Sequence, residues 1–538
     1  MKRWLYLIHR WGGIAVALFM FIWFSSGLVI MYAGSSALDY TEQLEGREAL
    51  NIESGWITLE QAWQKSAAQR AELPVEKLRN EAAGKNFDGD FIASARLVRQ
   101  AGVPIWQIEN GAGQRFAVSA ITGELHLTSS DEAKLIAQSW LKNRGEIALE
   151  NSSIRHIDTG IQDSSVRNYE TLRPFHRLTV GDGGRELLIS QRTGEVVRDS
   201  TRFTRALYWS GNWIHLLRPI ESLGSADARR NVQIWSGFIA AVASLTGIII
   251  GVQRWRPGWF GTATYSKGRV HPYRDVWNTW HFWVGLIGGF AALLWAFSGY
   301  MNTNPFQLFS PANPSRSELS NYQGRQPPAA MLNWQPAPLP ESKPDVVELQ
   351  WRYLGDNTVA TALTRDGDRF VQQLAGAVAG FSQDELVAAA TRILKNAQVT
   401  SVELRDDYDS YYYRRHEQSD LDRPLPILRV QFADAAGTRF YLDPQNGRLV
   451  LKQDASRRVY RWLYSALHHW DFGWLQLRPL WDAWMLPLVG MGIALGSTSV
   501  VLGWKRLQAD FKPKKKKKSA ERKSLRPSSL NNPADAPS

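Results

Sequence analysis

Four long apolar runs stand out in a chain of 538 residues that is otherwise mixed in polarity. They lie at residues 11–33, 232–253, 277–301 and 483–503. Each is close to the ~20 apolar residues that a helix needs to cross the hydrocarbon core of a bilayer. The pattern therefore predicts four transmembrane helices and two large water-soluble insertions.

The two insertions have the texture of α+β domains. Short runs with β-like alternation end in turns such as 193–195 (TGE) and 443–447 (DPQNG). Amphipathic helices are expected at 57–70 and 381–396, each with a Ser or Thr cap and a Gln or Glu three residues later. A Pro-rich stretch at 305–344 is expected to form an extended linker.

The first and third apolar runs repeat one pattern. Residues 9–27 and 281–299 align without a gap, so that histidine, tryptophan, glycine and serine fall in register. The matched pairs include His9 with His281 and Trp11 with Trp283. Apolarity alone does not align such residues. The fold class is therefore predicted to be an α-helical membrane protein made of two tandem repeats, each with two transmembrane helices and an α+β insertion.

The net charge of +12 is unevenly placed along the chain. Lysine and arginine are concentrated at 2–10, at 254–274 and at 505–526. The positive-inside rule places these segments, and with them both termini, in the cytoplasm. The insertions would then lie outside, in the periplasm of a Gram-negative host. Charge placed in this way indicates membrane topology and contact with lipid rather than binding of nucleic acid.

These observations assign each part of the chain. The first apolar run is too long for the core of a signal peptide, so it is expected to stay as an uncleaved anchor. The segments in order are transmembrane helix 1 at 1–33, a periplasmic domain at 34–202, an interfacial helix with transmembrane helix 2 at 203–256, a cytoplasmic loop at 257–275, transmembrane helix 3 at 276–302, a second periplasmic domain at 303–456, an interfacial helix with transmembrane helix 4 at 457–504, and a basic, disordered cytoplasmic tail at 505–538.

Several motifs resemble the PepSY-associated transmembrane family. They are the H-x-W-x-G start of two apolar runs, the TGE-type turns, and the segments 408–416 (YDSYYYRRH), 460–468 (YRWLYSALH) and 478–481 (RPLW). The resemblance covers nearly the whole chain. It implies an iron-regulated inner-membrane protein of Gram-negative bacteria with PepSY-like periplasmic domains. The best understood members resemble ferric-siderophore reductases that hold two b-type haems.

The chain has ten histidines and no cysteine. The lack of cysteine excludes iron–sulfur clusters, thiolate metal sites and covalently attached c-type haem. Topology places His9 and His281 at the inner ends of two related helices. It places His215 and His468 just outside the second and fourth apolar runs, with His469 as an alternative to His468. Together with the resemblance, this arrangement predicts that the two pairs are axial ligands of two haem irons.

Two tryptophans are further candidates for cofactor contact. Trp11 and Trp283 could pack against the haem macrocycles, or they could belong to the interfacial belt and the bundle core. The other histidines are expected to be ordinary loop or surface residues. They are His126, His156, His176, His271 and His416.

These features predict electron transfer across the membrane. No ionisable residue lies in the middle of an apolar run, which argues against a proton-driven transporter. No nucleotide-binding motif is present, so the donor would be a reduced flavin, a flavoprotein or a quinol on the cytoplasmic side. The acceptor implied by the resemblance is a periplasmic ferric-siderophore, which releases Fe(II) after reduction. No acid–base catalytic residue is predicted.

Other interpretations stay open at this point. The PepSY-like domains are of a type linked to peptidase inhibition, so the chain could be a membrane-anchored regulator or binding protein without haem. A siderophore permease subunit is disfavoured by the small, uncharged bundle. The segment 405–416 (RDDYDSYYYRRH) could receive an iron chelate or could be a plain exposed strand edge.

Overall fold

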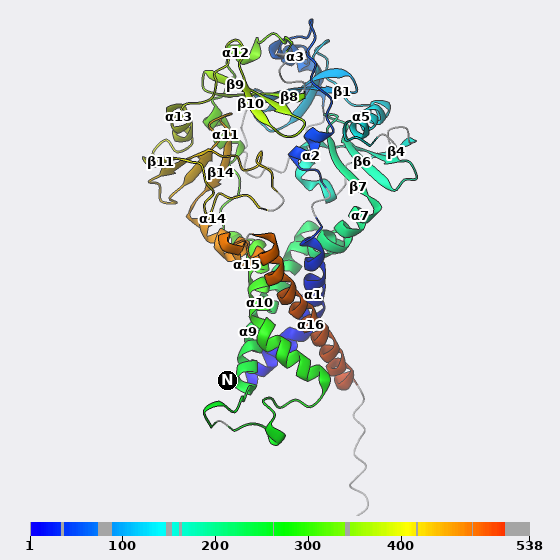
Figure 1. Cartoon of the computed structure of the whole chain (residues 1–538), viewed down its shortest axis with the longest axis vertical. Coiled ribbons are helices and arrows are strands. Elements are labelled where there is room, and N and C mark those ends of the chain that lie inside the picture. The colour runs from blue at the N-terminus through cyan, green and yellow to red at the C-terminus, as the bar shows by residue number, and fades with distance from the viewer. Residues whose placement is uncertain are drawn as a thin grey trace, which may run out of the picture.

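The protein consists of a helical stem that carries a broad α+β head (Figure 1). The computed structural model describes residues 2–33, 37–73, 89–146, 153–160, 164–261, 263–338, 345–415, 418–475 and 477–511. Most of the basic tail predicted at 505–538 lies outside these residues, although the last stem helix continues to Phe511.

Four helices form the stem. They are α1 (Lys2–Ile30), α9 (Ala226–Arg254), α10 (Val276–Asn302) and α16 (Arg478–Phe511). Three of them, α1, α9 and α16, are long and apolar enough to cross a membrane. The fourth, α10, qualifies if its parts Val276–Ile287 and Gly289–Asn302, bent by 67°, count as one span. The bend falls at consecutive glycines, which weaken a helix at that point.

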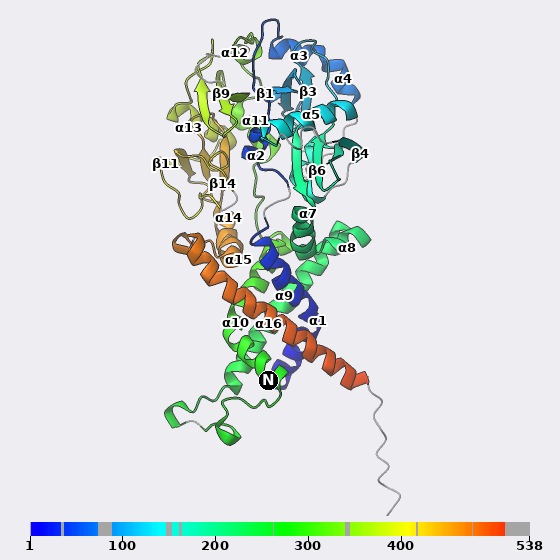
Figure 2. The same cartoon turned by 45° about the vertical axis from the view of Figure 1, so that its right-hand side comes forward.

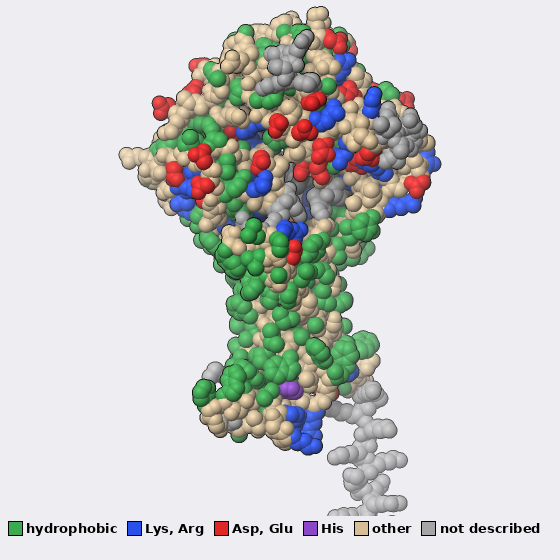
Figure 3. All heavy atoms as spheres, in the orientation of Figure 1, with side chains coloured by type: hydrophobic (Ala, Val, Ile, Leu, Met, Phe, Trp, Pro, Cys, Tyr) green, Lys and Arg blue, Asp and Glu red, His purple; other side chains and the backbone are tan. Residues whose placement is uncertain are grey.

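The stem helices pack closely because small residues face large ones. A methyl group on Gly492 of α16 would lie 2.3 Å from the ring of Phe24 on α1, and one on Gly496 would lie 2.8 Å from the backbone of Phe21. Such close approach is typical of helices that associate within a bilayer. Figure 2 shows α16 running obliquely across the other stem helices, and Figure 3 shows hydrophobic side chains covering the stem below the head.

Short helices join the stem to the head in both halves of the chain. The first set is α7 (Arg202–Tyr208), a π-helical turn η2 (Trp209–Trp213) and α8 (Arg218–Leu223). The second set is α14 (Ala455–Tyr460), a π-helical turn η6 (Arg461–Ala466) and α15 (Leu467–His469). Single π-helical turns are rare and occur frequently at functional sites.

A six-stranded antiparallel sheet runs through the head in the order β10-β9-β8-β1-β2-β3. Its strands are β1 (Ile92–Gln100), β2 (Val103–Asn110), β3 (Arg115–Ser119), β8 (Val346–Leu354), β9 (Asn357–Thr364) and β10 (Arg369–Gln372). Strands β1 and β8 pair directly, with Ala95 opposite Trp351. The two insertions predicted as separate domains therefore share one sheet, because an edge strand from each one completes the hydrogen bonding of the other.

Two four-stranded sheets flank the shared sheet, one from each insertion. The first is β4 (Ile154–Gly160), β5 (Phe175–Val180), β6 (Arg185–Ser190) and β7 (Val196–Thr201), with α5 (Ser130–Asn143) packed on it. The second is β11 (Val399–Arg405), β12 (Ile427–Phe432), β13 (Arg439–Leu442) and β14 (Leu449–Gln453), with α13 (Gln383–Ile393) packed on it. The expected α+β content of both insertions is thus present.

The remaining helices of the head are short. They are α2 (Tyr40–Glu45), α3 (Leu59–Lys65), α4 (Ala67–Glu72), η1 (Ser164–Leu172), α11 (Arg316–Gln323) and α12 (Ala329–Leu332). The stretch 305–344 is not extended throughout, because a capping box between Ser315 and Glu318 starts α11. The helix expected at 57–70 is broken at Ser66 into α3 and α4.

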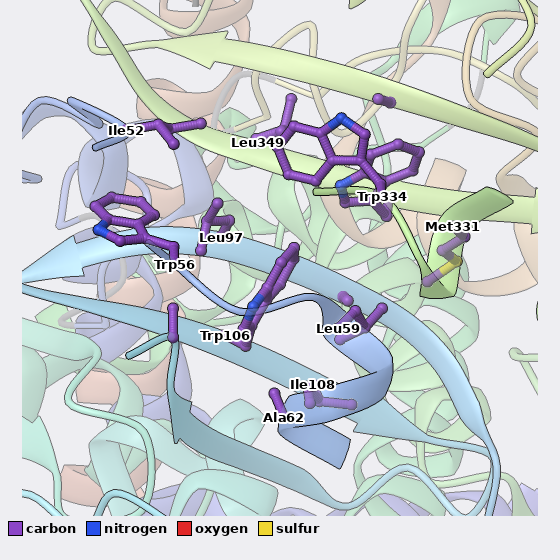
Figure 4. Packing of buried hydrophobic residues seen from close by; sticks show 14 of the residues in the cluster. Ile52, Trp56, Leu59, Ala62, Leu97, Trp106, Ile108, Met331, Trp334 and Leu349 are labelled. Carbon is purple, nitrogen blue, oxygen red and sulfur yellow. The ribbon is translucent and has the colours of Figure 1, made fainter. Parts of the chain in front are cut away.

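The largest core of the head contains residues from both insertions (Figure 4). Leu97 of β1 and Trp106 of β2 lie together with Leu349 of β8 and with Trp334. The rings of Trp106 and Trp334 are 6.4 Å apart in an edge-to-face arrangement. Because each insertion supplies part of this core, separating the two insertions would expose core residues of both.

Candidate functional site

The stem brings two histidines together near the end that carries the N-terminus. His9 lies on α1 and His281 lies on α10, and their ring centroids are 6.2 Å apart. These two residues were paired from the repeated sequence pattern. We call them the inner pair.

A second pair lies where the stem meets the head. His215 follows the π-helical turn η2, and His468 follows the π-helical turn η6 within α15. Their ring centroids are 6.3 Å apart. We call them the outer pair. The structure thus brings together both pairs that the sequence predicted.

In the outer pair, equivalent residues of α1 and α10 hold the two histidines. The Nδ1 atom of His215 lies 3.0 Å from Ser26 Oγ, and that of His468 lies 3.1 Å from Ser298 Oγ. Two tryptophan indoles add a second contact each, to the histidine backbone carbonyls. Trp23 Nε1 donates to His215 at 3.1 Å, and Trp295 Nε1 donates to His468 at 3.0 Å.

The inner pair also has a hydrogen bond at each Nδ1 atom. His9 Nδ1 lies 2.9 Å from the carbonyl oxygen of Ala243 on α9. His281 Nδ1 lies 3.1 Å from the hydroxyl of Thr498 on α16. Each histidine is therefore oriented by the helix that neighbours its own.

The partner of His9 fixes the tautomer of that imidazole, and the other three partners are compatible with the same tautomer. A carbonyl oxygen only accepts, so His9 must donate from Nδ1. The hydroxyls of Ser26, Ser298 and Thr498 each lie within hydrogen-bond distance of a carbonyl of their own helix, so each can donate to that carbonyl and accept from the histidine. With the proton on Nδ1, the lone pair on each Nε2 is available to a metal.

The spacing within each pair fits two imidazoles on opposite sides of one metal. With metal–nitrogen bonds of about 2 Å, the two ring centroids lie about 6 Å apart. Space for His9 depends on Gly247 of α9, where a methyl group would lie 2.6 Å from the ring. Among the described residues there is no group of three or more His, Asp or Glu side chains that could hold a metal ion. Two-coordinate axial ligation of a planar cofactor is what the four histidines can provide.

His469 occupies a different position from His468. Its ring packs on Tyr464 at 5.4 Å, and its backbone carbonyl accepts a hydrogen bond from the indole of Trp481 at 2.9 Å. The ring of His468 is the one that faces His215. The structure therefore places His468, and not its neighbour, opposite the partner from the first half.

The two tryptophans named as cofactor contacts differ in their surroundings. Trp11 is 46 % exposed on the outer surface of the stem, where a lipid-facing side chain would lie. Trp283 is partly buried beside His271 and Phe282, with ring centroids 5.8 and 5.2 Å away. The expectation that both pack on a macrocycle stays a prediction, and the exposure of Trp11 favours its interfacial alternative.

Three of the other histidines lie in the head, away from the two pairs, whereas His271 packs on Phe282, the neighbour of His281, at 5.1 Å. His126 forms an ion pair with Glu132 at 3.1 Å. His156 and His176 contact each other on the flanking sheet of the first insertion. His416 lies outside the described residues.

The segment 405–415 of the head contacts the residues on either side of His468, an arrangement that the sequence did not reveal. Its Tyr413 donates a hydrogen bond to Asp471, and Arg415 Nη2 donates to Ser465 at 3.0 Å. Arg461 Nη1 forms an ion pair with the same Asp471 at 2.8 Å. Burial raises the pKa of Asp471 despite these partners. No spacing motif links these residues, because they come from separate segments.

Apolar helices of membrane-spanning length beneath an α+β head define the chain as a membrane protein. It belongs to the family described as the PepSY-associated TM region, whose family model matches residues 6–380. The match confirms the resemblance seen in the sequence motifs, and it includes His9, His215 and His281. No curated protein matches the chain.

Proposed function

We propose that this protein carries electrons across the bacterial inner membrane through two b-type haems, one at each histidine pair. The observation that carries the proposal is common to all four histidines. Each imidazole has its Nδ1 atom engaged, each Nε2 is free of hydrogen bonds among the described residues, and the rings face each other in two pairs at 6.2 and 6.3 Å. A haem held by two imidazoles supplies one-electron transfer and has no open position for oxygen.

The two pairs are well placed for transfer across a bilayer. His9 and Ser26, the residue that holds His215, are 17 positions apart on α1. At 1.5 Å per residue this separation is about 25 Å along the helix. The hydrocarbon core of a bilayer is about 30 Å thick. The inner pair would therefore serve one face of the membrane and the outer pair the other.

The proposed topology has four spans, with the bent α10 as the third, arranged as two tandem repeats. Equivalent contacts support the repeat, since Trp23 and Ser26 of α1 are matched by Trp295 and Ser298 of α10. Basic side chains gather at the stem end opposite the head (Figure 3), which supports cytoplasmic termini and a periplasmic head.

The acceptor that we propose is a ferric-siderophore on the periplasmic side, from which Fe(II) is released. The chain's own contribution is to orient four imidazoles, to separate the two pairs by apolar helices, and to brace the segment that carries His468 through Tyr413 and Arg415. A reduced flavin, a flavoprotein or a quinol would donate electrons at the inner pair. Residues of the chain carry no acid–base step.

An absorption spectrum of the detergent-purified protein, expressed with ample haem, tests this proposal. A sharp low-spin b-type spectrum with two haems per chain, reducible by dithionite, is the expected result. Reoxidation of the reduced protein by a ferric-siderophore, followed with an Fe(II) chelator, tests the acceptor. A folded protein without a Soret band would contradict the proposal and favour a haem-free membrane-anchored regulator. The His281→Ala variant is expected to lose one of the two haems.

A further inference from the structure

The head contains a cavity of about 210 Å³ above one face of the shared six-stranded sheet. All six strands contribute residues to its lining. Alternation along the strands explains its character. Ala95, Leu97 and Trp351 point into the apolar core, so their neighbours Arg96 and Arg352 point to the other face, where the cavity lies.

Arginines dominate the cavity wall. Five of them line it, against a single carboxylate, Glu109. These arginines are Arg96, Arg115, Arg352, Arg369 and Arg448. A second cavity of about 210 Å³ shares five lining residues with the first and adds Arg316. The two cavities therefore adjoin, and Arg352 and Arg448 line both of them.

Most of these arginines have a carboxylate partner. Arg96 pairs with Glu195 at 2.8 Å, and Arg369 pairs with Asp443. Glu109 is shared between Arg115 at 3.3 Å and Arg316 at 2.8 Å. Each of these four arginines therefore has a carboxylate that balances its charge.

The two arginines that line both cavities, Arg352 and Arg448, form no ion pair with a carboxylate among the described residues, although Asp443 acts on both from a greater distance. The backbone of Arg352 is paired within the sheet, but its guanidinium forms no hydrogen bond or ion pair with any described residue. Arg448 donates from Nη2 to the backbone carbonyls of Leu421 and Asp422, while its Nε is buried without a partner. Burial and the neighbouring Arg448 lower the pKa of Arg352 to about 10. Two desolvated guanidinium groups that repel each other and form no ion pair destabilise the head, and a bound anion would offset this repulsion.

We propose that this cavity binds a small organic polyanion with two or more carboxylate or phosphate groups. Arg352 and Arg448, which line both cavities, would each bind one group through paired N–H donors. Because arginines line both of the adjoining cavities, a ligand with anionic groups at separate positions is favoured over a single compact ion. A siderophore is too large for the space, so this site is separate from the proposed reductase function and does not depend on it.

Calorimetric titration of the full-length protein in detergent, in Tris chloride buffer, tests the proposal with citrate and inorganic phosphate as probes. Citrate is expected to bind, and to bind more tightly than phosphate. The Arg352→Gln and Arg448→Gln variants are expected to bind citrate about tenfold or more weakly, because each loses a bidentate contact. The exposed Arg177→Gln serves as the matched control and is expected to bind like the wild type.

Thermal unfolding of the same proteins separates loss of the site from loss of the fold. Without ligand, Arg352→Gln is expected to unfold at a temperature equal to or above that of the wild type, since an unpaired buried charge is removed. Citrate is expected to raise the unfolding temperature of the wild type and to leave that of Arg352→Gln unchanged. Absence of citrate binding, tighter binding of phosphate than of citrate, or full affinity in both arginine variants would each overturn the proposal.

Discussion

In the first half of the chain, Trp23 and Ser26 hold His215, and in the second half Trp295 and Ser298 hold His468 with the same atoms at nearly the same distances. The heads of the two halves also share a turn. Gly194 donates to a carbonyl four residues earlier at 2.8 Å, and Gly447 does the same at 2.8 Å. Both glycines have positive φ, which the turn requires.

The residue after that turn glycine differs in charge between the halves. It is Glu195 in the first half, whose carboxylate is buried among Arg47, Arg96 and Arg115. It is Arg448 in the second half, which faces the basic cavity. The stem thus repeats a polar contact that fixes an imidazole, while the head uses one turn to place opposite charges. The two halves therefore have the same polar contacts in the stem and opposite charges at equivalent turns in the head.

The largest expected effect tests the equivalence of the outer histidines. His215→Ala and His468→Ala are each expected to reduce the haem content from two to one per chain, because each removes an axial ligand of the same haem. The measurement is the pyridine haemochrome content of purified protein. His469→Ala is the control and is expected to keep both haems. If His469→Ala lost a haem and His468→Ala did not, His469 and not His468 would be the axial ligand.

The second largest expected effect is on the free energy of unfolding, and it tests the opposite charges of Glu195 and Arg448. Glu195→Ala is expected to destabilise the head by about 3–5 kcal/mol, because it removes the buried carboxylate that lies among Arg47, Arg96 and Arg115 and leaves their positive charges less well balanced. Arg448→Ala is expected to cost no more than about 1 kcal/mol, because no carboxylate loses its partner. Denaturant unfolding followed by tryptophan fluorescence measures both. Equal losses of stability would break the comparison.

A pH titration sharpens the same contrast. Burial raises the pKa of Glu195, but Arg96, Arg115 and Arg47 outweigh it and lower the pKa to about 2. A lowered pKa in the folded state gives stability that is complete above the unfolded value of 4.5 and is lost as the pH falls toward 2. The unfolding temperature of the wild type is expected to fall across this range, and that of Glu195→Gln is expected to fall less. Parallel curves for the two proteins would assign the acid sensitivity to other carboxylates.

The smallest expected effect concerns the serines of the stem. Ser26→Ala and Ser298→Ala each remove the acceptor that orients one outer imidazole, and such losses typically weaken metal binding 10–100-fold. We expect the two variants to lose outer haem to apomyoglobin at similarly increased rates. Ser210→Ala, whose hydroxyl bonds only within its own helix, is the control. A large effect at only one serine would show that the two halves hold the haem unequally.

The sequence predicted local elements more completely than their assembly. The apolar runs predicted the stem helices, because about 20 consecutive apolar residues are the length that a helix needs to cross the hydrocarbon core of a bilayer. Strand-like runs gave much of the head. The pairing of β1 with β8 was missed, because residues such as Ala95 and Trp351 are far apart in the chain and no local pattern records which edge meets which. The same reason hid the basic cavity, whose walls come from six strands.

By itself, the sequence determined the family, the apolar stem and the candidate histidines, because these depend on residue type and spacing. Only the tertiary structure decided which histidines face each other and which atoms are free. Consecutive residues on a helix point about 100° apart, so only one of His468 and His469 can face His215. The packing of the helices decides that this residue is His468, while the ring of His469 packs on Tyr464. Packing also supplied Ala243 and Thr498 as partners of the inner pair, and these contacts, made between helices, leave each Nε2 open to a metal.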